Sequence, residues 1–333
     1  MLKDPDNRIL RKVFLDLQPQ WEEEVLLLRE ELEKTGVGCE NLTQKIWERR
    51  GEWCKEAVVL TDSPERCAKF SQADVVCFGC SYSIEWFDGA ALVLEGFEGI
   101  DARYLEEWML RAQGLPAVIA RTERLEIREM AERDLPEMIR IGNESGAVEN
   151  LSVNADMFSE ERLSSYIKTA YRLQGYGLWS VLHEGKLIGC CGFAPWDAAT
   201  IARADSEEGR QLSAAKEGSV ESVRLTAAEE GSVRSGQLTV AAAYRIFRLA
   251  FPVTESEECQ ILTRPEKSAL ELQYMLDRAY RRQGFGTEMC QTALEYAYER
   301  LDADEIYLRI RLNNQASRAL AKKLHFIEQQ DIG

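Results

Sequence analysis

The second half of the chain alternates between two periods of apolar residues, one typical of strands and one of helices. Strands are expected at 124–130, 179–183, 186–193, 271–276, 305–311 and 326–328. Helices are expected at 134–142, 160–173, 287–300 and 316–324, with Asp134 and Ser159 as caps. The order is strand, two helices, hairpin, strand, helix, strand, helix, strand. It predicts a mixed sheet flanked by helices.

The first half has a different rhythm, in which short apolar runs alternate with helices. Strands are expected at 57–60, 75–78 and 90–94, and helices at 8–17, 20–34, 42–50, 65–72 and 102–113. Such alternation implies a small parallel α/β layer. A length of 333 residues also favours two domains. We therefore predict an α/β (α+β) chain with domains at 1–121 and 122–333.

Charge and composition exclude several kinds of partner. The net charge of -16 argues against a nucleic-acid backbone or an anionic membrane. No apolar run is long enough to span a bilayer, and the N-terminus is charged from its third residue, unlike a secretion signal. Nine cysteines without such a signal are expected to be reduced thiols. The cytoplasm is the expected compartment.

Cys77-Phe-Gly-Cys80 has the spacing of a redox pair or of half a metal site. A zinc site needs about four ligands, and the two histidines, His183 and His325, lie far from Cys77 in the sequence. Two buried thiols at the end of a strand are the favoured interpretation. We expect no metal site.

The segment 271–300 combines a strand, a charged turn and an amphipathic helix. The turn contains Arg281-x-x-Gly284-x-Gly286, and glycines let the backbone turn tightly and approach a ligand. The following helix directs its free N–H groups and positive dipole end at the turn. This arrangement suits a phosphate or pyrophosphate, although the glycines alone are equally consistent with a plain turn.

In this order of elements, the turn resembles the acetyl-coenzyme A motif of the GNAT N-acetyltransferase superfamily. The segments 271–288 and 314–326 carry the resemblance, the second through Asn314-Gln-Ala-Ser317 and the later Lys323 and Phe326. The opening 124–135 resembles the ribosomal-protein-acetylating branch. The match covers residues 124 to the C-terminus, less one insert.

The resemblance implies an acetyl-CoA-dependent N-acetyltransferase that moves an acetyl group to a primary amine by direct attack in a ternary complex. Glu271 stands where many members carry a catalytic base. Backbone N–H groups near the thioester would stabilise the oxyanion. The residues expected to bind the cosubstrate are Met275, Leu276, Asp277, Arg281, Arg282, Gln283, Gly284, Phe285, Gly286, Thr287, Asn314 and Ser317.

Three departures from the family pattern stand out. Ala321 replaces the tyrosine that often serves as the acid, which leaves Tyr280 and Tyr307 as candidates. A low-complexity insert at 196–268 contains a near-repeat (214–222 and 227–235) and is interpreted as a polar excursion, a lid or a partner arm. Within the insert, 241–251 has helical spacing. The chain also ends after its sixth strand, so we expect an acceptor pocket that is incomplete or completed by a neighbour.

These departures keep a second function open, that of a non-catalytic coenzyme A-binding module acting as sensor or scaffold. The acceptor is expected to be a small-molecule amine or a protein N-terminus, and a homodimer is left open. The N-terminal half resembles the later part of haloacid dehalogenase-like hydrolases through Thr61-Asp62-Ser63 after a strand. Asp4-Pro5-Asp6 has the spelling of that family's nucleophile motif without the preceding strand, which implies a truncated, non-catalytic module.

Overall fold

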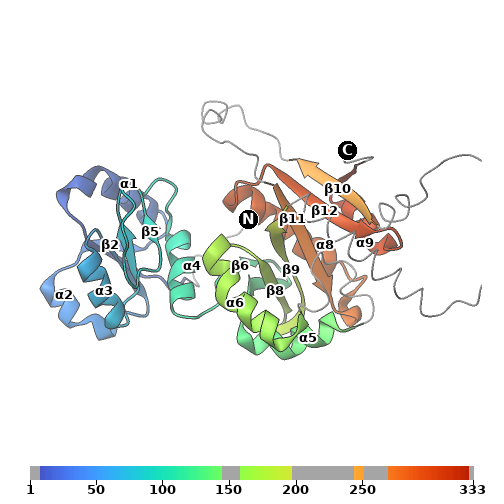
Figure 1. The fold of residues 1–333 in the computed structure, drawn as a ribbon, viewed down its shortest axis with the longest axis horizontal. Coiled ribbons are helices and arrows are strands. Elements are labelled where there is room, and N and C mark those ends of the chain that lie inside the picture. Colours follow the sequence, from blue (N-terminus) through green and yellow to red (C-terminus); the bar gives the residue numbers. More distant parts are fainter. Residues whose placement is uncertain (1–7, 145–157, 197–243, 251–268, 330–333) are drawn as a thin grey trace, which may run out of the picture. The chain divides into compact units, whose positions relative to one another are not determined.

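The computed structural model describes residues 8–144, 158–196, 244–250 and 269–329, and the predictions for Asp4-Pro5-Asp6 and for the near-repeat lie outside these ranges (Figure 1). The chain divides into two compact units, Met1–Ala131 and Glu132–Gly333. Within the described ranges, no helix has the length and apolar character needed to cross a membrane.

The N-terminal unit is built on a five-stranded parallel sheet. Its strands are β1 (Lys12–Asp16), β2 (Gly38–Asn41), β3 (Ala57–Thr61), β4 (Cys77–Cys80) and β5 (Val93–Leu94), in the order β2-β1-β3-β4-β5. Its helices are α1 (Glu22–Glu33), α2 (Gln44–Glu48), α3 (Pro64–Gln72) and α4 (Ala102–Ala112). An antiparallel hairpin, β6 (Val118–Arg121) and β7 (Leu125–Glu129), follows. The predicted parallel α/β layer is confirmed.

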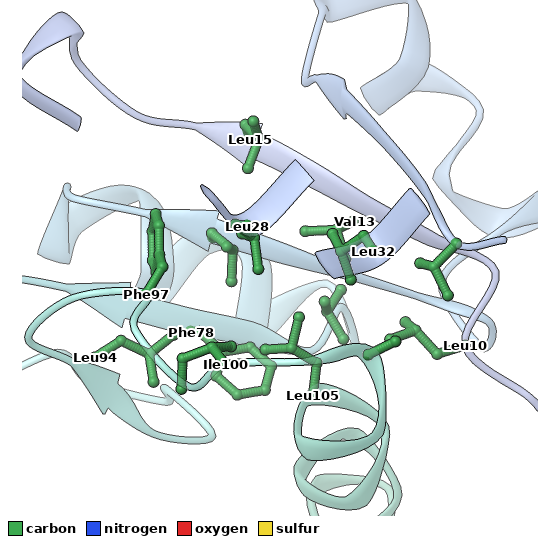
Figure 2. Packing of buried hydrophobic residues seen from close by; sticks show 14 of the residues in the cluster. Leu10, Val13, Leu15, Leu28, Leu32, Phe78, Leu94, Phe97, Ile100 and Leu105 are labelled. Atoms are coloured by element: carbon green, nitrogen blue, oxygen red, sulfur yellow. The ribbon is translucent and has the colours of Figure 1, made fainter. Parts of the chain in front are cut away.

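The helix predicted at 8–17 is wrong, because this segment forms strand β1. Its three central residues are buried on both faces of the sheet. Val13 and Leu15 pack in one apolar cluster with α1 and α4, while Phe14 packs in the other with α3. Figure 2 shows the first cluster. A strand buried on both faces shows no alternation, and that removes the sequence signal for it. The short strands β2 and β6 were also not predicted.

The C-terminal unit contains a mixed sheet with helices. Its strands are β8 (Leu178–His183), β9 (Lys186–Pro195), β10 (Tyr244–Ala250), β11 (Ala269–Leu276), β12 (Glu305–Arg311) and β13 (Ile327–Glu328), in the order β13-β10-β12-β11-β9-β8. Its helices are α5 (Leu135–Gly142), α6 (Glu160–Gln174), α8 (Phe285–Arg300) and α9 (Gln315–Lys323). Short 3-10 turns cover Glu132–Asp134 and Arg278–Tyr280. Apart from β10, the helices and strands of this unit follow one another in the predicted order.

The two predicted helix caps differ in outcome. Ser159 caps α6, because its side chain accepts a hydrogen bond from the Arg162 N–H. Asp134 makes no side-chain cap on α5. Its carboxylate instead accepts a hydrogen bond from Ser180 Oγ at 2.9 Å, which ties the start of α5 to strand β8.

The largest correction concerns the insert. The spacing at 241–251 predicted a helix, but Tyr244–Ala250 form strand β10. β10 pairs antiparallel with β12 over seven residue pairs, from Tyr244–Arg311 to Ala250–Glu305, and with β13 through Phe247 and Arg248. It lies between β12 and β13 in the order of the sheet, and Figure 1 shows it beside β12. The sheet therefore contains a strand from the insert that was not predicted.

Phe247 provides a test of this placement, because its side chain is fully buried at the centre of β10. We expect Phe247→Ala to lower the free energy of unfolding by about 3–5 kcal/mol, the usual cost of deleting a buried aromatic ring. The exposed Arg245 on the same strand is the matched control. Arg245→Ala is expected to change the free energy of unfolding by less than about 1 kcal/mol. Urea unfolding measures both. Equal effects of the two substitutions would contradict the position of β10.

Candidate functional site

Strands β11 and β12 begin side by side and then separate. They pair in parallel only from Ala269–Glu305 to Glu271–Tyr307. Both strands continue, β11 to Leu276 and β12 to Arg311. The other edge of β11 pairs with β9 along its length. Among the described residues, no strand therefore pairs with the edge of β11 that faces β12 beyond Glu271.

A cleft of about 860 Å³ lies at this split. Strand β11, the turn after it, the start of α8 and the first two turns of α9 form its walls. The lining residues are Tyr274, Met275, Leu276, Arg281, Arg282, Gly284, Gly286, Thr287, Met289, Asn313, Asn314, Gln315, Ala316, Ser317, Ala319, Leu320 and Lys323. Among the described residues that line the cleft, three carry cationic side chains and none carries a carboxylate. The cleft is thus a local basic site in a chain of net charge -16.

The two glycines of the turn have different roles. Gly284 is the N-cap of α8 and has a φ of 88°, in the left-handed region that favours glycine. Gly286 lies inside α8, and a Cβ there would meet nothing closer than 4.0 Å. Gly284 is needed for the turn, whereas Gly286 keeps the cleft wall free of a side chain. Both place the N-terminal N–H groups of α8 at the cleft.

Two cations are positioned by contacts with the cleft wall itself. Arg281 Nε donates a hydrogen bond to the Leu276 carbonyl at 2.9 Å, so the turn folds back on the end of β11. Lys323 Nζ, at the end of α9, lies 3.3 Å from Thr287 Oγ1 in the first turn of α8. Positive charge therefore reaches the start of α8 from two separate elements.

Asn314 and Ser317 form the start of α9. Asn314 Oδ1 accepts a hydrogen bond from the Ser317 N–H at 3.0 Å, which makes Asn314 the N-cap of that helix. Both side chains line the cleft. A second helix N-terminus, with its favourable field for anions, thus faces the same space as the first.

Three of the sequence-predicted binding residues hold the turn without lining the cleft. Gln283 Nε2 donates to the Ala279 carbonyl at 2.8 Å, and Phe285 packs against His183. Asp277 is buried and accepts hydrogen bonds from the Ala279 N–H and from Arg140 of α5. Burial acts to raise the pKa of Asp277, but these two donors outweigh it and the pKa lies below its usual value. The other nine predicted cosubstrate-binding residues line the cleft.

Glu271, the predicted catalytic base, lies at the last paired position of β11 and is 5% exposed. Its Oε1 lies 3.8 Å from Nε of the buried Arg309 on β12. Side chains alternate along a strand, so Glu271 and Met275 share one face of β11, while Tyr274 and Leu276 share the other. Glu271 does not line the cleft.

Eight lining residues lie outside the predicted binding set, although the resemblance implied that the backbone from Tyr274 onward binds the pantetheine. They are Tyr274, Met289, Asn313, Gln315, Ala316, Ala319, Leu320 and Lys323. Burial raises the pKa of Tyr274, so its hydroxyl stays protonated. The two tyrosines proposed as acids lie elsewhere in the unit. Tyr280 packs near His183, and the Tyr307 hydroxyl donates to Glu305 Oε2 at 2.7 Å. The position of Met289 on α8 could have indicated that it lines the cleft. Tyr274 lines the cleft only because β11 and β12 separate beside it.

The Cys77–Cys80 spacing does not bring two sulfur atoms together. Cys77 packs in the apolar cluster on one face of the N-terminal sheet, and Cys80 packs in the cluster on the other. Both thiols are buried. Burial raises the pKa of Cys80, as expected for an unreactive core thiol. Among the described residues, no group of three or more potential metal-ligating side chains converges.

Comparison with known proteins finds one family match, in the C-terminal unit. Residues 251–327 match the model of a family described as "Acetyltransferase (GNAT) domain". No curated protein matches the chain. Among solved structures, a probable acetyltransferase shares 13% identity with a TM-score of 0.36, covering 65% of this chain and 84% of that one.

Two further structures are similar to the same degree. The ribosomal L7/L12 alpha-N-protein acetyltransferase RimL, solved in complex with coenzyme A, shares 14% identity at a TM-score of 0.35, covering 62% of this chain and 82% of its own. A GNAT-family acetyltransferase from Bacillus anthracis shares 13% identity at a TM-score of 0.34, covering 61% and 80%. Likeness at this level carries no information about activity.

The comparisons give no support to a haloacid dehalogenase-like N-terminal half. The residues behind that resemblance have structural partners in the N-terminal unit. Ser63 caps α3 by accepting from the Arg66 N–H. Thr61 Oγ1 donates to Asp16 at 2.8 Å, and Arg66 forms an ion pair with the same carboxylate at 2.9 Å.

The contrast between the two glycines can be tested by the same substitution at each. Gly284→Ala is expected to lower the free energy of unfolding by about 1–2 kcal/mol, because alanine is strained in the left-handed region. Gly286→Ala is expected to leave it unchanged or raise it by less than about 1 kcal/mol, because its Cβ has room and alanine favours a helix. Urea unfolding of the two variants measures the difference. A cost at Gly286 equal to that at Gly284 would contradict the turn geometry.

Proposed function

We propose that the C-terminal unit is an acetyl-CoA-dependent N-acetyltransferase that transfers the acetyl group to a primary amine. The observation that carries the proposal is the split between β11 and β12, lined by cations and by two helix N-termini. The family match over 251–327 supports acetyl transfer in general. Donor identity, acceptor class and residue roles belong to the proposal.

The cleft fits the two chemically different parts of coenzyme A. An extended pantetheine arm can add to the unpaired edge of β11 through main-chain hydrogen bonds, as peptides add to sheet edges. The pyrophosphate suits the N-terminus of α8, where backbone N–H groups and the helix dipole favour an anion. Arg281, Arg282 and Lys323 add positive charge at that end. The absence of carboxylates from the lining avoids repulsion of the phosphates.

The transfer step needs a hydrogen-bond donor for the oxyanion, a base for the amine proton and a sulfur leaving group. In the proposal, a backbone N–H near Met275 or Leu276, on the unpaired part of β11, stabilises the charge on the thioester carbonyl oxygen. Glu271 receives the proton of the attacking amine, directly or through water. Its position at the last paired residue of β11 sets it close to the point where the two strands separate. The amine nitrogen forms a C–N bond to the carbonyl carbon, the C–S bond breaks, and coenzyme A leaves as a thiolate that keeps the electron pair.

Gly286 offers a sharp test of cosubstrate binding. Gly286→Glu would place a carboxylate in the cleft beside the start of α8, so we expect acetyl-CoA to bind at least about 100-fold more weakly. Gly286→Ala is the matched control and is expected to bind within a few-fold of the parent. Isothermal titration calorimetry with acetyl-CoA measures both, and circular dichroism checks that each variant is folded. Unchanged affinity of the Gly286→Glu variant would remove the cleft as the donor site.

Glu271 separates the proposed enzyme from a coenzyme A-binding module. We expect the parent protein to release thiol from acetyl-CoA with at least one amine of a panel of peptides, polyamines and aminoglycosides. Glu271→Gln is expected to lower kcat by about 100-fold or more, because it removes the base while keeping the side-chain shape. The affinity of the Glu271→Gln variant for acetyl-CoA should equal that of the parent, because Glu271 lies outside the cleft. Tight binding of acetyl-CoA by the parent without turnover on any amine would instead favour a sensor or scaffold.

A further inference from the structure

A second cysteine pair in the N-terminal unit is far closer than the Cys77–Cys80 spacing. Cys67, on α3, and Cys77, on β4, face each other across the interface between helix and sheet. Their sulfur atoms lie 2.7 Å apart, with the Cys77 thiol donating to the Cys67 sulfur. Both residues are buried in the same apolar cluster. No local motif links the two residues, because ten positions separate them.

We propose that Cys67 and Cys77 form a reversible disulfide that cross-links α3 to β4 when the protein reacts with hydrogen peroxide. A disulfide requires sulfur atoms about 2.05 Å apart, so the pair must close by roughly 0.7 Å. A helix that packs on a strand through side chains can move by that amount without a change of fold. The cross-link would close the loop of residues 67–77.

The two thiols are not equivalent, and this sets the order of the chemistry. The hydrogen bond from Cys77 lowers the pKa of Cys67, while the same hydrogen bond and burial raise the pKa of Cys77. Cys67 is therefore the nucleophile and Cys77 the resolving thiol. Burial of both means that peroxide reaches them only when α3 opens locally.

The reaction balances with one molecule of peroxide. The Cys67 thiolate attacks one peroxide oxygen, the O–O bond breaks, and the departing hydroxide takes up the proton lost by Cys67 to become water. Cys67 is then a sulfenic acid. The Cys77 sulfur attacks the Cys67 sulfur, the S–O bond breaks, and the hydroxide leaves with the Cys77 proton as a second water. Two thiols are oxidised to one disulfide, and thiol reductants restore them.

Other cysteines could compete for Cys67, and the structure ranks them. Cys80 lies on the same strand as Cys77, but its side chain packs on the opposite face of the sheet. Cys54 is the other described thiol that packs against the same cluster as the pair, where it is partly buried. The inference therefore predicts one specific link, not general oxidation of the unit.

Mass spectrometry of the full-length protein tests the link. The protein is treated with hydrogen peroxide at low urea, which allows α3 to open, and is then unfolded, alkylated and digested with trypsin. We expect loss of two alkylation sites and a cross-link between peptides 67–69 and 70–103. Cys80→Ser should keep this link, and that shows that Cys77, not Cys80, is the partner in peptide 70–103. Cys67→Ser and Cys77→Ser should each abolish it.

Stability gives an independent readout. The oxidised protein should show an unfolding midpoint about 1–2 M higher in urea than the reduced protein, for the transition of the N-terminal unit. The double variant Cys67→Ser/Cys77→Ser should show no difference between oxidised and reduced samples. Two results would overturn the inference. One is a link from Cys67 to Cys54 or Cys80, and the other is survival of both thiols, or their conversion to sulfinic acid, under conditions that open α3.

Discussion

The separation of β11 from β12 beyond Glu271 and Tyr307 is the constraint on which the C-terminal unit depends. A strand edge inside a sheet normally meets its partner along its whole length, because unpaired backbone groups are costly when buried. Here the edge of β11 opens onto a cleft, and helices α8 and α9 both begin at that cleft. All three features leave backbone groups available to a ligand. A split sheet, a basic turn and two helix starts thus form one site.

A split can persist only if each diverging strand is held from its other side. β11 is held by β9, which pairs with it from Leu270 to Leu276. β12 is held by β10, which pairs with it over seven residues. β10 comes from the insert, far from β12 in the sequence. The insert is therefore not only an excursion, because it contributes the strand that supports one wall of the split.

Local signals in the sequence account for most of the correct predictions. The turn at Gly284 depends on a few neighbouring residues and was placed correctly, whereas the N-cap role of Asn314 was not predicted. Strands β1 and β10 were misread as helices, because burial on both faces of β1 removes alternation and the partners of β10 lie far along the chain. The resemblance implied that the backbone from Tyr274 to Asp277 binds the pantetheine, but the Tyr274 side chain received no role. Tyr274 lines the cleft because β11 and β12 separate beside it, and no local pattern encodes that separation.

The split also explains how a donor site and a base on opposite faces of one strand can act together. Leu276 faces the α8 and α9 side, where Gly286 is its neighbour, whereas alternation puts Glu271 on the other face. In a continuous sheet, paired backbone would separate the two faces. Where β11 and β12 part, that barrier ends, and it ends immediately after Glu271. Under the proposed function, the donor enters from the basic face and the amine approaches from the face of Glu271. The two meet only at the point where the strands diverge, so the pairing register of β11 with β12 determines which carboxylate can serve as the base.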